Sequence, residues 1–181
     1  GIVGRLRPEK GHRHLFEALP KVIQAKPDFA LLAVGSGSLE GELMALAGRL
    51  GLERHVRFAG FRTDVPRILN ALDLFVMPSI SEGLGTAALE AGAAGLPIVA
   101  SREGGITDII TDGEHGLLAP PGDAPALAEA IVRMTLDRDL AARCAHAVRQ
   151  RVCAEFSEEA LVEKNDAIYR AWFERRALIA G

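Results

Sequence analysis

Apolar residues follow two alternating patterns along most of this chain. Short, unbroken apolar runs predict buried strands at residues 2–3, 29–34, 56–58, 74–77, 98–100 and 116–119. Longer segments between them repeat apolar residues at helical spacing and predict helices at residues 12–25, 39–50, 64–71 and 86–95. Asp64 stands where it would cap the third of these helices. Strands that alternate with helices predict an α/β fold, a parallel sheet with helices on both faces.

The pattern becomes wholly helical after the Pro-Pro-Gly-Asp turn at residues 120–123. Helices are predicted at residues 124–136, 137–152 and 157–178, with Ser157 at the start of the last. That last helix carries Tyr169, Trp172 and Phe173. We expect these aromatic side chains to pack on the sheet domain. The alternative is that some of them contact a domain absent from this chain.

Size and composition are those of one ordinary globular domain, with 181 residues, 49% apolar and 25% charged. A formal net charge of −3 gives no reason to expect a nucleic acid as a partner. No apolar run approaches the roughly 18 residues of a membrane span, and no signal peptide is visible. The opening Gly1-Ile2-Val3-Gly4 resembles a strand entered partway, so we expect the chain to be a piece of a longer protein.

The two cysteines, Cys144 and Cys153, lie nine positions apart in one predicted helix. Nine residues are two and a half helical turns, which puts the two thiols on nearly opposite faces. We therefore expect no disulfide between them, and their spacing to His and other Cys residues does not suggest a metal site.

The most informative segment follows the fourth predicted strand, where a turn containing Gly83 and Gly85 leads into a helix at Thr86. Such a turn directs backbone amides at an anion. Glu82 and Glu90 bracket it, and Glu90 lies one helical turn beyond Thr86 on the same face. A carboxylate there can accept hydrogen bonds from two neighbouring ribose hydroxyls. Amides and carboxylates together suit a ligand with both phosphate and hydroxyl groups, such as a nucleotide sugar.

Each of these residues also has a structural interpretation. Glu90 is placed to favour the helix dipole, and Glu82 is placed as a solvent-facing loop acid. Thr86 is either a helix cap or a phosphate ligand, since its hydroxyl cannot fully serve both roles.

Cationic residues gather after the first predicted strand, in a loop with Arg5 and Lys10 between Gly4 and Gly11. A guanidinium fork and a mobile ammonium suit phosphate oxygens, and together they would neutralise a diphosphate that gains charge as its bond to a sugar breaks. The alternative is a solvated basic loop that only precedes a helix.

A third glycine turn, Gly35-Ser36-Gly37, follows the second predicted strand and leads into a helix. Its spacing departs from the dinucleotide fingerprint, and no acidic residue ends a strand about 20 positions later. Two interpretations of this turn stay open: it forms a tight strand-to-helix connection near a ligand, or it contacts the ligand directly. A fourth turn contains Gly104 and Gly105, and the later His115 is expected to be structural.

Taken together, these motifs resemble the donor half of retaining glycosyltransferases of family 4, which have the GT-B fold. The likeness extends from Gly4 to about Trp172. It implies a Rossmann-like domain in which Arg5 and Lys10 hold the diphosphate, Glu82 faces the donor sugar and Glu90 holds the ribose. Further donor contacts are implied for these residues: Gly4, Gly35, Gly37, Gly83, Leu84, Gly85 and Thr86. Leu84 replaces the Phe of many members, a change that could alter contacts with the sugar, so the identity of the sugar stays open. Thr86-Ala87 replaces the Leu-Pro or Ile-Pro that is common in the family.

We therefore expect residues 1–181 to be the nucleotide-sugar-binding half of a retaining, hexosyltransferase-type enzyme that needs no metal or other cofactor. Its acceptor domain would be absent, so the isolated chain is expected to bind donor but to transfer little. We take UDP as the nucleotide of the donor for the present. The sequence does not determine the base, the sugar or the acceptor. A cytoplasmic location is expected, with peripheral membrane contact through the missing half. The alternatives are a Rossmann-type nucleotide-binding module, a GT-B nucleotide-sugar epimerase and a scaffold domain without activity.

Overall fold

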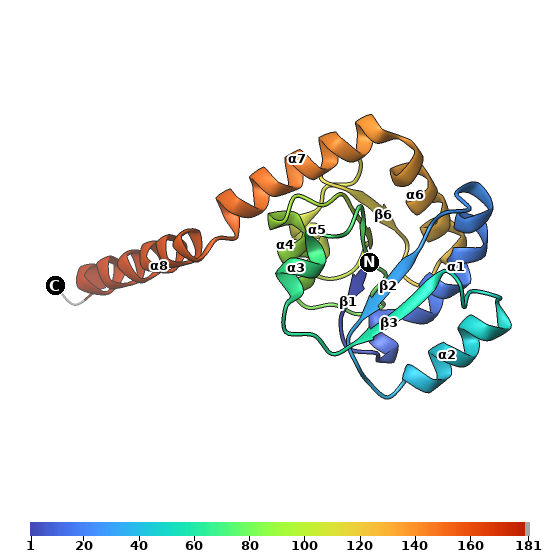
Figure 1. The fold of residues 1–181 in the computed structure, drawn as a ribbon. Coiled ribbons are helices and arrows are strands. Elements are labelled where there is room, and N and C mark those ends of the chain that lie inside the picture. Colours follow the sequence, from blue (N-terminus) through green and yellow to red (C-terminus); the bar gives the residue numbers. More distant parts are fainter. Residues whose placement is uncertain (180–181) are drawn as a thin grey trace.

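The computed structural model describes the backbone of residues 1–179 and the side chains of residues 1–172. It has the predicted α/β architecture (Figure 1). The strands are β1 (Ile2–Val3), β2 (Leu31–Val34), β3 (Val56–Gly60), β4 (Phe75–Met77), β5 (Ile98–Ser101) and β6 (Leu117–Ala119). The helices that follow them are η1 (Pro8–Lys10), α1 (His12–Ala25), α2 (Glu40–Arg49), α3 (Val65–Leu69), α4 (Thr86–Ala93), α5 (Ile106–Ile109), α6 (Ala124–Leu136), α7 (Arg138–Glu155) and α8 (Glu158–Ile179).

The strands form two parallel sheets, in the orders β1-β2-β3 and β4-β5-β6. Backbone hydrogen bonds join them edge to edge, because the amide of Val76 donates to the carbonyl of Gly1 at 2.9 Å. The amino nitrogen of Gly1 also donates to the carbonyl of Leu74 at 2.7 Å. The combined order is therefore β3-β2-β1-β4-β5-β6. In such sheets ligands bind beyond the carboxyl ends of the strands, where the order reverses, here between β1 and β4.

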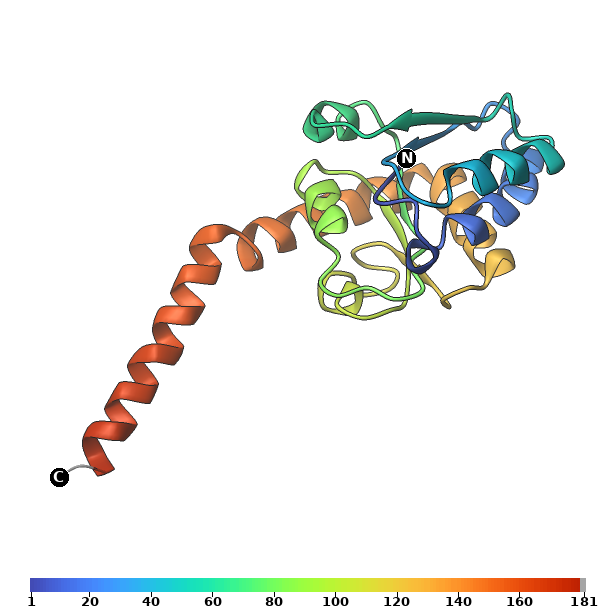
Figure 2. The ribbon, with the colours of Figure 1, turned by 90° about the horizontal axis from the view of Figure 1, so that it is seen from below.

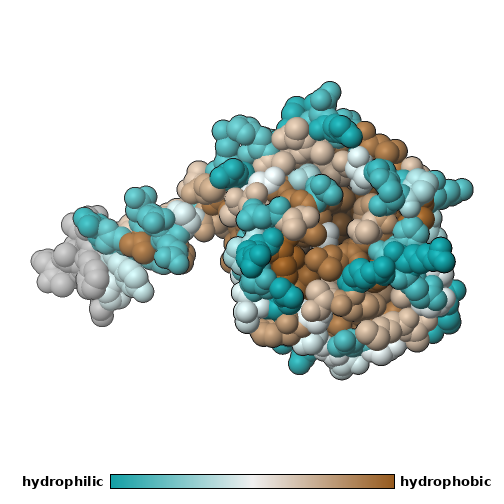
Figure 3. All heavy atoms as spheres, in the orientation of Figure 1, coloured by the Kyte–Doolittle hydropathy of each residue, from teal (hydrophilic) through white to brown (hydrophobic). Residues whose placement is uncertain are grey.

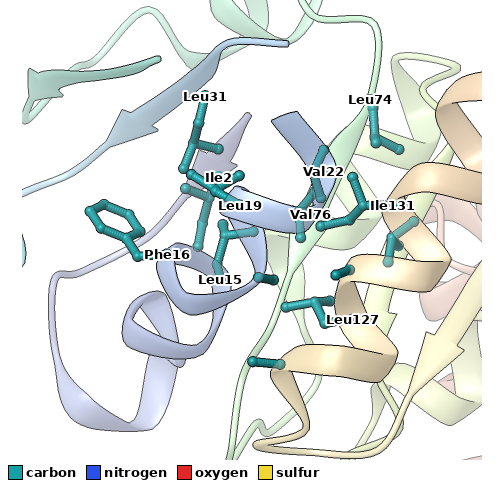
Figure 4. Close-up of a cluster of buried hydrophobic side chains, with 14 of the residues drawn as sticks. Ile2, Leu15, Phe16, Leu19, Val22, Leu31, Leu74, Val76, Leu127 and Ile131 are labelled. Carbon is teal, nitrogen blue, oxygen red and sulfur yellow. The ribbon is translucent and has the colours of Figure 1, made fainter. Parts of the chain in front are cut away.

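Side chains alternate across the strands and fill two separate cores. Val76 of β4 and Val99 of β5 belong to a core formed with α1, α2 and α6, whose central side chains are seen in Figure 4. Their neighbours Phe75 and Ile98 belong to a second core formed with α3, α4 and α5. Because β4 and β5 are buried on both faces, their sequences do not alternate between apolar and exposed polar residues, whereas the edge strand β3 exposes Arg57. Helices on both faces are thus confirmed.

Helix α7 contributes to both cores. Leu140 and Cys144 lie in the core of α1 and α6, while Val148 and Val152 lie in the core of α4 and α5. Cys153, on the other side of the helix, is exposed and both cysteines are free, as predicted.

Helix α8 extends away from the domain, as Figures 1 and 2 show from two directions. Tyr169 is 64% exposed and Trp172 is 48% exposed. The expected packing of these aromatic residues on the sheet domain is therefore wrong, because the helix that carries them leaves the domain at residue 157. The side chain of Phe173 lies outside the described residues. None of the helices described over residues 1–179 is both long and apolar enough to cross a membrane.

Two helix starts test the capping predictions. Ser157 accepts a hydrogen bond from the amide of Ala160 at 3.2 Å, so its predicted role is confirmed. Asp64 precedes α3 but makes no side-chain capping bond. Its carboxylate instead accepts two hydrogen bonds from Arg62, at 2.8 and 2.7 Å, and this charged fork displaces the weaker cap.

Candidate functional site

A cleft of about 450 Å³ opens at the carboxyl ends of the central strands. It brings together Arg5 and Lys10 from the loop after β1 with Glu82, Thr86 and Glu90 from the segment after β4. The other lining residues are Val3, Gly4, Val34, Gly35, Ser36, Phe61, Arg62, Val65, Met77 and Ala87. Figure 3 shows hydrophobic atoms gathered in a hollow in the middle of the domain surface, with hydrophilic side chains around it.

The loop after β1 is held by its neighbour β2. The amide of Gly4 donates to the carbonyl of Val34 at 2.9 Å, and the amide of Leu6 donates to the carbonyl of Ser36 at 3.0 Å. Gly35 has a φ of 134°, and a Cβ there would overlap the carbonyl oxygen of Gly4. Only glycine allows this approach, which brings the two loops to the same side of the cleft.

Lys10 and Glu82 form an ion pair inside the cleft, with Nζ and Oε2 2.7 Å apart and side chains 21% and 10% exposed. Backbone contacts align their loops, since the amide of Ile80 donates to the carbonyl of Glu9 at 2.8 Å. Gly11 (φ 68°) packs so closely on the carbonyl of Pro78 that a Cβ would overlap it. The basic loop is therefore not merely solvated, and Glu82 is not a solvent-facing acid.

The start of α4 presents free backbone donors to the cleft. Gly85 is the residue before the helix, with a φ of 80°, and its carbonyl accepts from the amides of Ala88 and Leu89. The amides of Thr86 and Ala87 precede these bonds, so they are the ones available to an anion. Thr86 is the first helical residue rather than the cap, which removes the capping interpretation of its hydroxyl. Thr86 and Glu90 both line the cleft, so their predicted shared face is confirmed.

The turn between β5 and α5 supports the loop that carries Glu82. The amide of Gly105 donates to the carbonyl of Gly83 at 2.7 Å. A Cβ on Gly104 would overlap the carbonyl of Glu82. This fourth glycine turn thus serves the site through backbone contact rather than by lining the cleft.

Not every predicted ligand residue lines the cleft. Gly37 lines an adjoining hollow of about 520 Å³, shared with Arg5 and Phe61. Gly83, Leu84 and Gly85 do not line the cleft either: Gly83 and Leu84 are exposed, with Leu84 49% exposed, and Gly85 is buried.

Three lining residues beyond β3, Phe61, Arg62 and Val65, were not identified from the sequence. Phe61 is 74% exposed, and Arg62 is paired with Asp64. The side-chain hydrogen bonds from Arg62 lower the pKa of Asp64 to about 2, so both groups are charged at neutral pH. The signal that would have found them is their position just after a strand of a parallel sheet.

His12, at the start of α1, is buried with 1% exposed surface, and neither ring nitrogen has a hydrogen-bond partner in the described part of the chain. Burial and, to a smaller extent, the charge of Lys10 lower the pKa of His12 to about 4. It is therefore neutral at pH 7. His115 lies within its turn, 3.4 Å from the amide of Thr111, which agrees with a structural role. Over the described residues, no three His, Cys, Asp or Glu side chains are placed to share a metal ion.

The structure defines an α/β domain with a cleft at the carboxyl ends of its central strands, and comparison with known proteins identifies its family. The family model described as "Glycosyl transferases group 1" matches residues 1–151. The chain belongs to this family, and its fold is that of a GT-B glycosyltransferase domain. It is 37% identical over 161 residues to the lipopolysaccharide core biosynthesis glycosyltransferase LpsE of Rhizobium meliloti, covering 89% of this chain and 46% of the relative.

Solved structures agree with this assignment. Anabaena Alr3699/HepE in complex with UDP and glucose has a TM-score of 0.84 at 31% identity, over 96% of this chain and 47% of the other. The C-terminal domain of the glycosyl transferase group 1 family protein LpcC from Francisella tularensis has a TM-score of 0.81 at 28% identity, over 87% of this chain and 85% of that domain. The chain thus spans about half the length of the curated relatives that it matches.

Proposed function

We propose that this chain is the donor-binding half of a retaining glycosyltransferase that takes a sugar from a nucleoside diphosphate. One observation carries the proposal: cationic side chains after β1 and free amides at the start of α4 meet in a single cleft with two carboxylates. Anabaena HepE, which has this fold, was solved with UDP and with UDP-glucose, which supports UDP as the first nucleotide to test.

The diphosphate would lie between Arg5, Lys10 and the amides of Thr86 and Ala87. These groups carry positive charge where negative charge develops as the bond from the anomeric carbon to oxygen breaks. The protein itself would supply this charge, so the proposed reaction needs no metal ion. We assign leaving-group stabilisation to this half, rather than nucleophilic catalysis.

The remaining parts of the donor fit the other walls of the cleft. Glu90, one turn into α4, would accept hydrogen bonds from the ribose hydroxyls. Glu82 would face the sugar. The apolar side chains of Phe61 and Val65, across the cleft after β3, offer surface to the base.

The acceptor would bind to a second domain outside this chain, which is consistent with relatives about twice its length. The isolated chain is expected to bind donor and to transfer little. A GT-B epimerase would share this donor site and differ in the step after cleavage. A dinucleotide-binding module is disfavoured by the spacing at Gly35, where no acid follows on the next strand.

A calorimetric titration of the chain with UDP, GDP and ADP tests the proposal. We expect micromolar to millimolar binding of at least one of them, weakened in Arg5→Ala and in Glu90→Ala. Arg49→Ala, at the exposed end of α2, is the matched control. Absence of binding to all three would overturn the proposal, and NADH binding without any response to them would favour the dinucleotide module.

A further inference from the structure

Ser79 is a buried hydroxyl residue directed at one of the two cleft carboxylates. It follows β4 and Pro78, and only 1% of its surface is exposed. Its Oγ donates a hydrogen bond to Oε2 of Glu82 at 3.0 Å. The same oxygen accepts the hydrogen bond from Nζ of Lys10 at 2.7 Å. Because both partners use Oε2, the other carboxylate oxygen of Glu82 is left for a ligand.

The two partners of Glu82 differ in mobility. Lys10 ends in a flexible four-carbon chain, and an ammonium can turn toward another anion. Ser79 has a short side chain in a fixed segment, since the next amide, of Ile80, is bonded to Glu9 at 2.8 Å. On the other side, the carbonyl of Pro78 is in tight contact with Gly11. A diphosphate that enters the cleft can therefore attract Lys10 but cannot displace Ser79.

We propose that Ser79 is a positioning residue, which keeps the Glu82 carboxylate directed at the donor sugar after Lys10 has turned to the diphosphate. This inference rests on the proposed function and names a residue that acts through Glu82. It follows that Ser79 affects recognition of the sugar and leaves recognition of the nucleotide unchanged.

The test compares sugar nucleotides with the free nucleotide by calorimetry. The probes are UDP, UDP-glucose, UDP-galactose and UDP-N-acetylglucosamine, and the sugar nucleotide chosen is one whose affinity falls in Glu82→Gln. Ser79→Ala is expected to lower the affinity for that sugar nucleotide by about tenfold, the effect of losing a hydrogen bond to a charged group. The same variant is expected to change the affinity for UDP by less than about twofold. Ser101→Ala removes another buried serine hydroxyl, at the end of β5, and is expected to change neither affinity.

A double-mutant cycle separates positioning from a general structural role. In the Glu82→Gln background, Ser79→Ala is expected to add little further loss, because the carboxylate that Ser79 holds is already gone. Ser79→Thr, which keeps the hydroxyl, is expected to retain most of the sugar-nucleotide affinity, and it replaces the alanine variant if that variant does not fold.

The outcomes are distinct. Equal weakening of UDP and the sugar nucleotide by Ser79→Ala, or an undiminished effect in the Glu82→Gln background, would overturn the role of Ser79. The role would also be overturned if Glu82→Gln changed the affinity for none of the sugar nucleotides, or if a folded Ser79→Thr variant had no affinity for the sugar nucleotide. If UDP, GDP and ADP all fail to bind the parent chain, the proposed function itself fails.

Discussion

Lys10 and Glu82, 72 positions apart in the sequence, lie with Nζ and Oε2 2.7 Å apart in the cleft between β1 and β4. Their contact joins the first and the fourth crossovers of the sheet at the point where the strand order reverses. The cation assigned to the diphosphate and the acid assigned to the sugar are therefore adjacent, and each variant of one must be interpreted together with the other.

Replacing Lys10 with methionine should weaken UDP binding by about 10- to 100-fold, the effect of losing one charge-assisted hydrogen bond. Calorimetry measures the affinity, and thermal unfolding shows whether Glu82 tolerates loss of its partner. Lys21→Met is the control, because Lys21 pairs with Glu129 on the exposed outer surface. An unchanged affinity in a folded Lys10→Met protein would contradict the diphosphate assignment.

Glu90→Ala should remove the preference for UDP over 2′-deoxy-UDP. The parent chain is expected to bind UDP more tightly, because a carboxylate can accept from both ribose hydroxyls, and the variant should bind the two nucleotides alike. Paired titrations measure this, with Glu129→Ala as a surface control. A preference that persists in the variant places the ribose elsewhere.

Gly11→Ala should destabilise the domain by several kcal/mol, since alanine at a φ of 68° is strained and its Cβ overlaps the carbonyl of Pro78. Denaturant unfolding measures the loss. Gly41→Ala is the matched control, because Gly41 lies in α2 with nothing within 4 Å of the added Cβ. That change is expected to raise stability by about 0.5 kcal/mol through helix propensity. Similar results for the two variants would mean that the close approach at Gly11 is absent.

His12 should make stability depend on pH. Its pKa is about 4 in the folded protein and 6.5 in the unfolded chain, so between these values the unfolded state binds more protons. The contribution of His12 to the free energy of unfolding is therefore fully present above about pH 6.5. It falls by roughly 2–3 kcal/mol as the pH decreases toward 4. Urea unfolding at pH 7 and pH 5 should show a smaller difference in His12→Leu than in the parent. His146→Gln, at an exposed position of α7, should behave like the parent.

Removal of residues 158–181 should change the stability of the remaining domain by less than about 1 kcal/mol. Leu161 and Val162, in the first turns of α8, are 60% and 65% exposed, so the truncation uncovers little buried surface. Thermal unfolding of both proteins checks this. A large fall in the melting temperature would show that α8 folds back onto the domain.

The strand and helix pattern was predictable because the central strands β4 and β5 are buried on both faces and glycine turns follow them. The helix His12–Ala25 was predicted within its observed bounds. Four-residue α5 and three-residue η1 were missed, because such short elements carry no periodic signal. The aromatic residues of α8 were misplaced because apolar spacing identifies a helix face without identifying what covers it.

The cleft was predictable where charge and glycine coincide, as at Arg5, Lys10 and Glu82. Phe61 and Ser79 were missed, because neither residue carries a charge or belongs to a glycine turn, and only their positions shortly after a strand mark them. The place of Phe61 in the cleft and the hydrogen bond from Ser79 to Glu82 are visible only in the folded structure. The predicted cytoplasmic location and membrane contact stay predictions.

The position of helix α7 links the unfolding of the two hydrophobic cores. Its first half is embedded in one core and its second half in the other, through Leu140 and Val148 respectively. If one core unfolds, α7 loses the contacts of one of its halves, and its remaining half must then leave the other core as well. Unfolding of the two cores is thereby coupled into one cooperative transition, and the cleft between β1 and β4 is lost together with the rest of the domain.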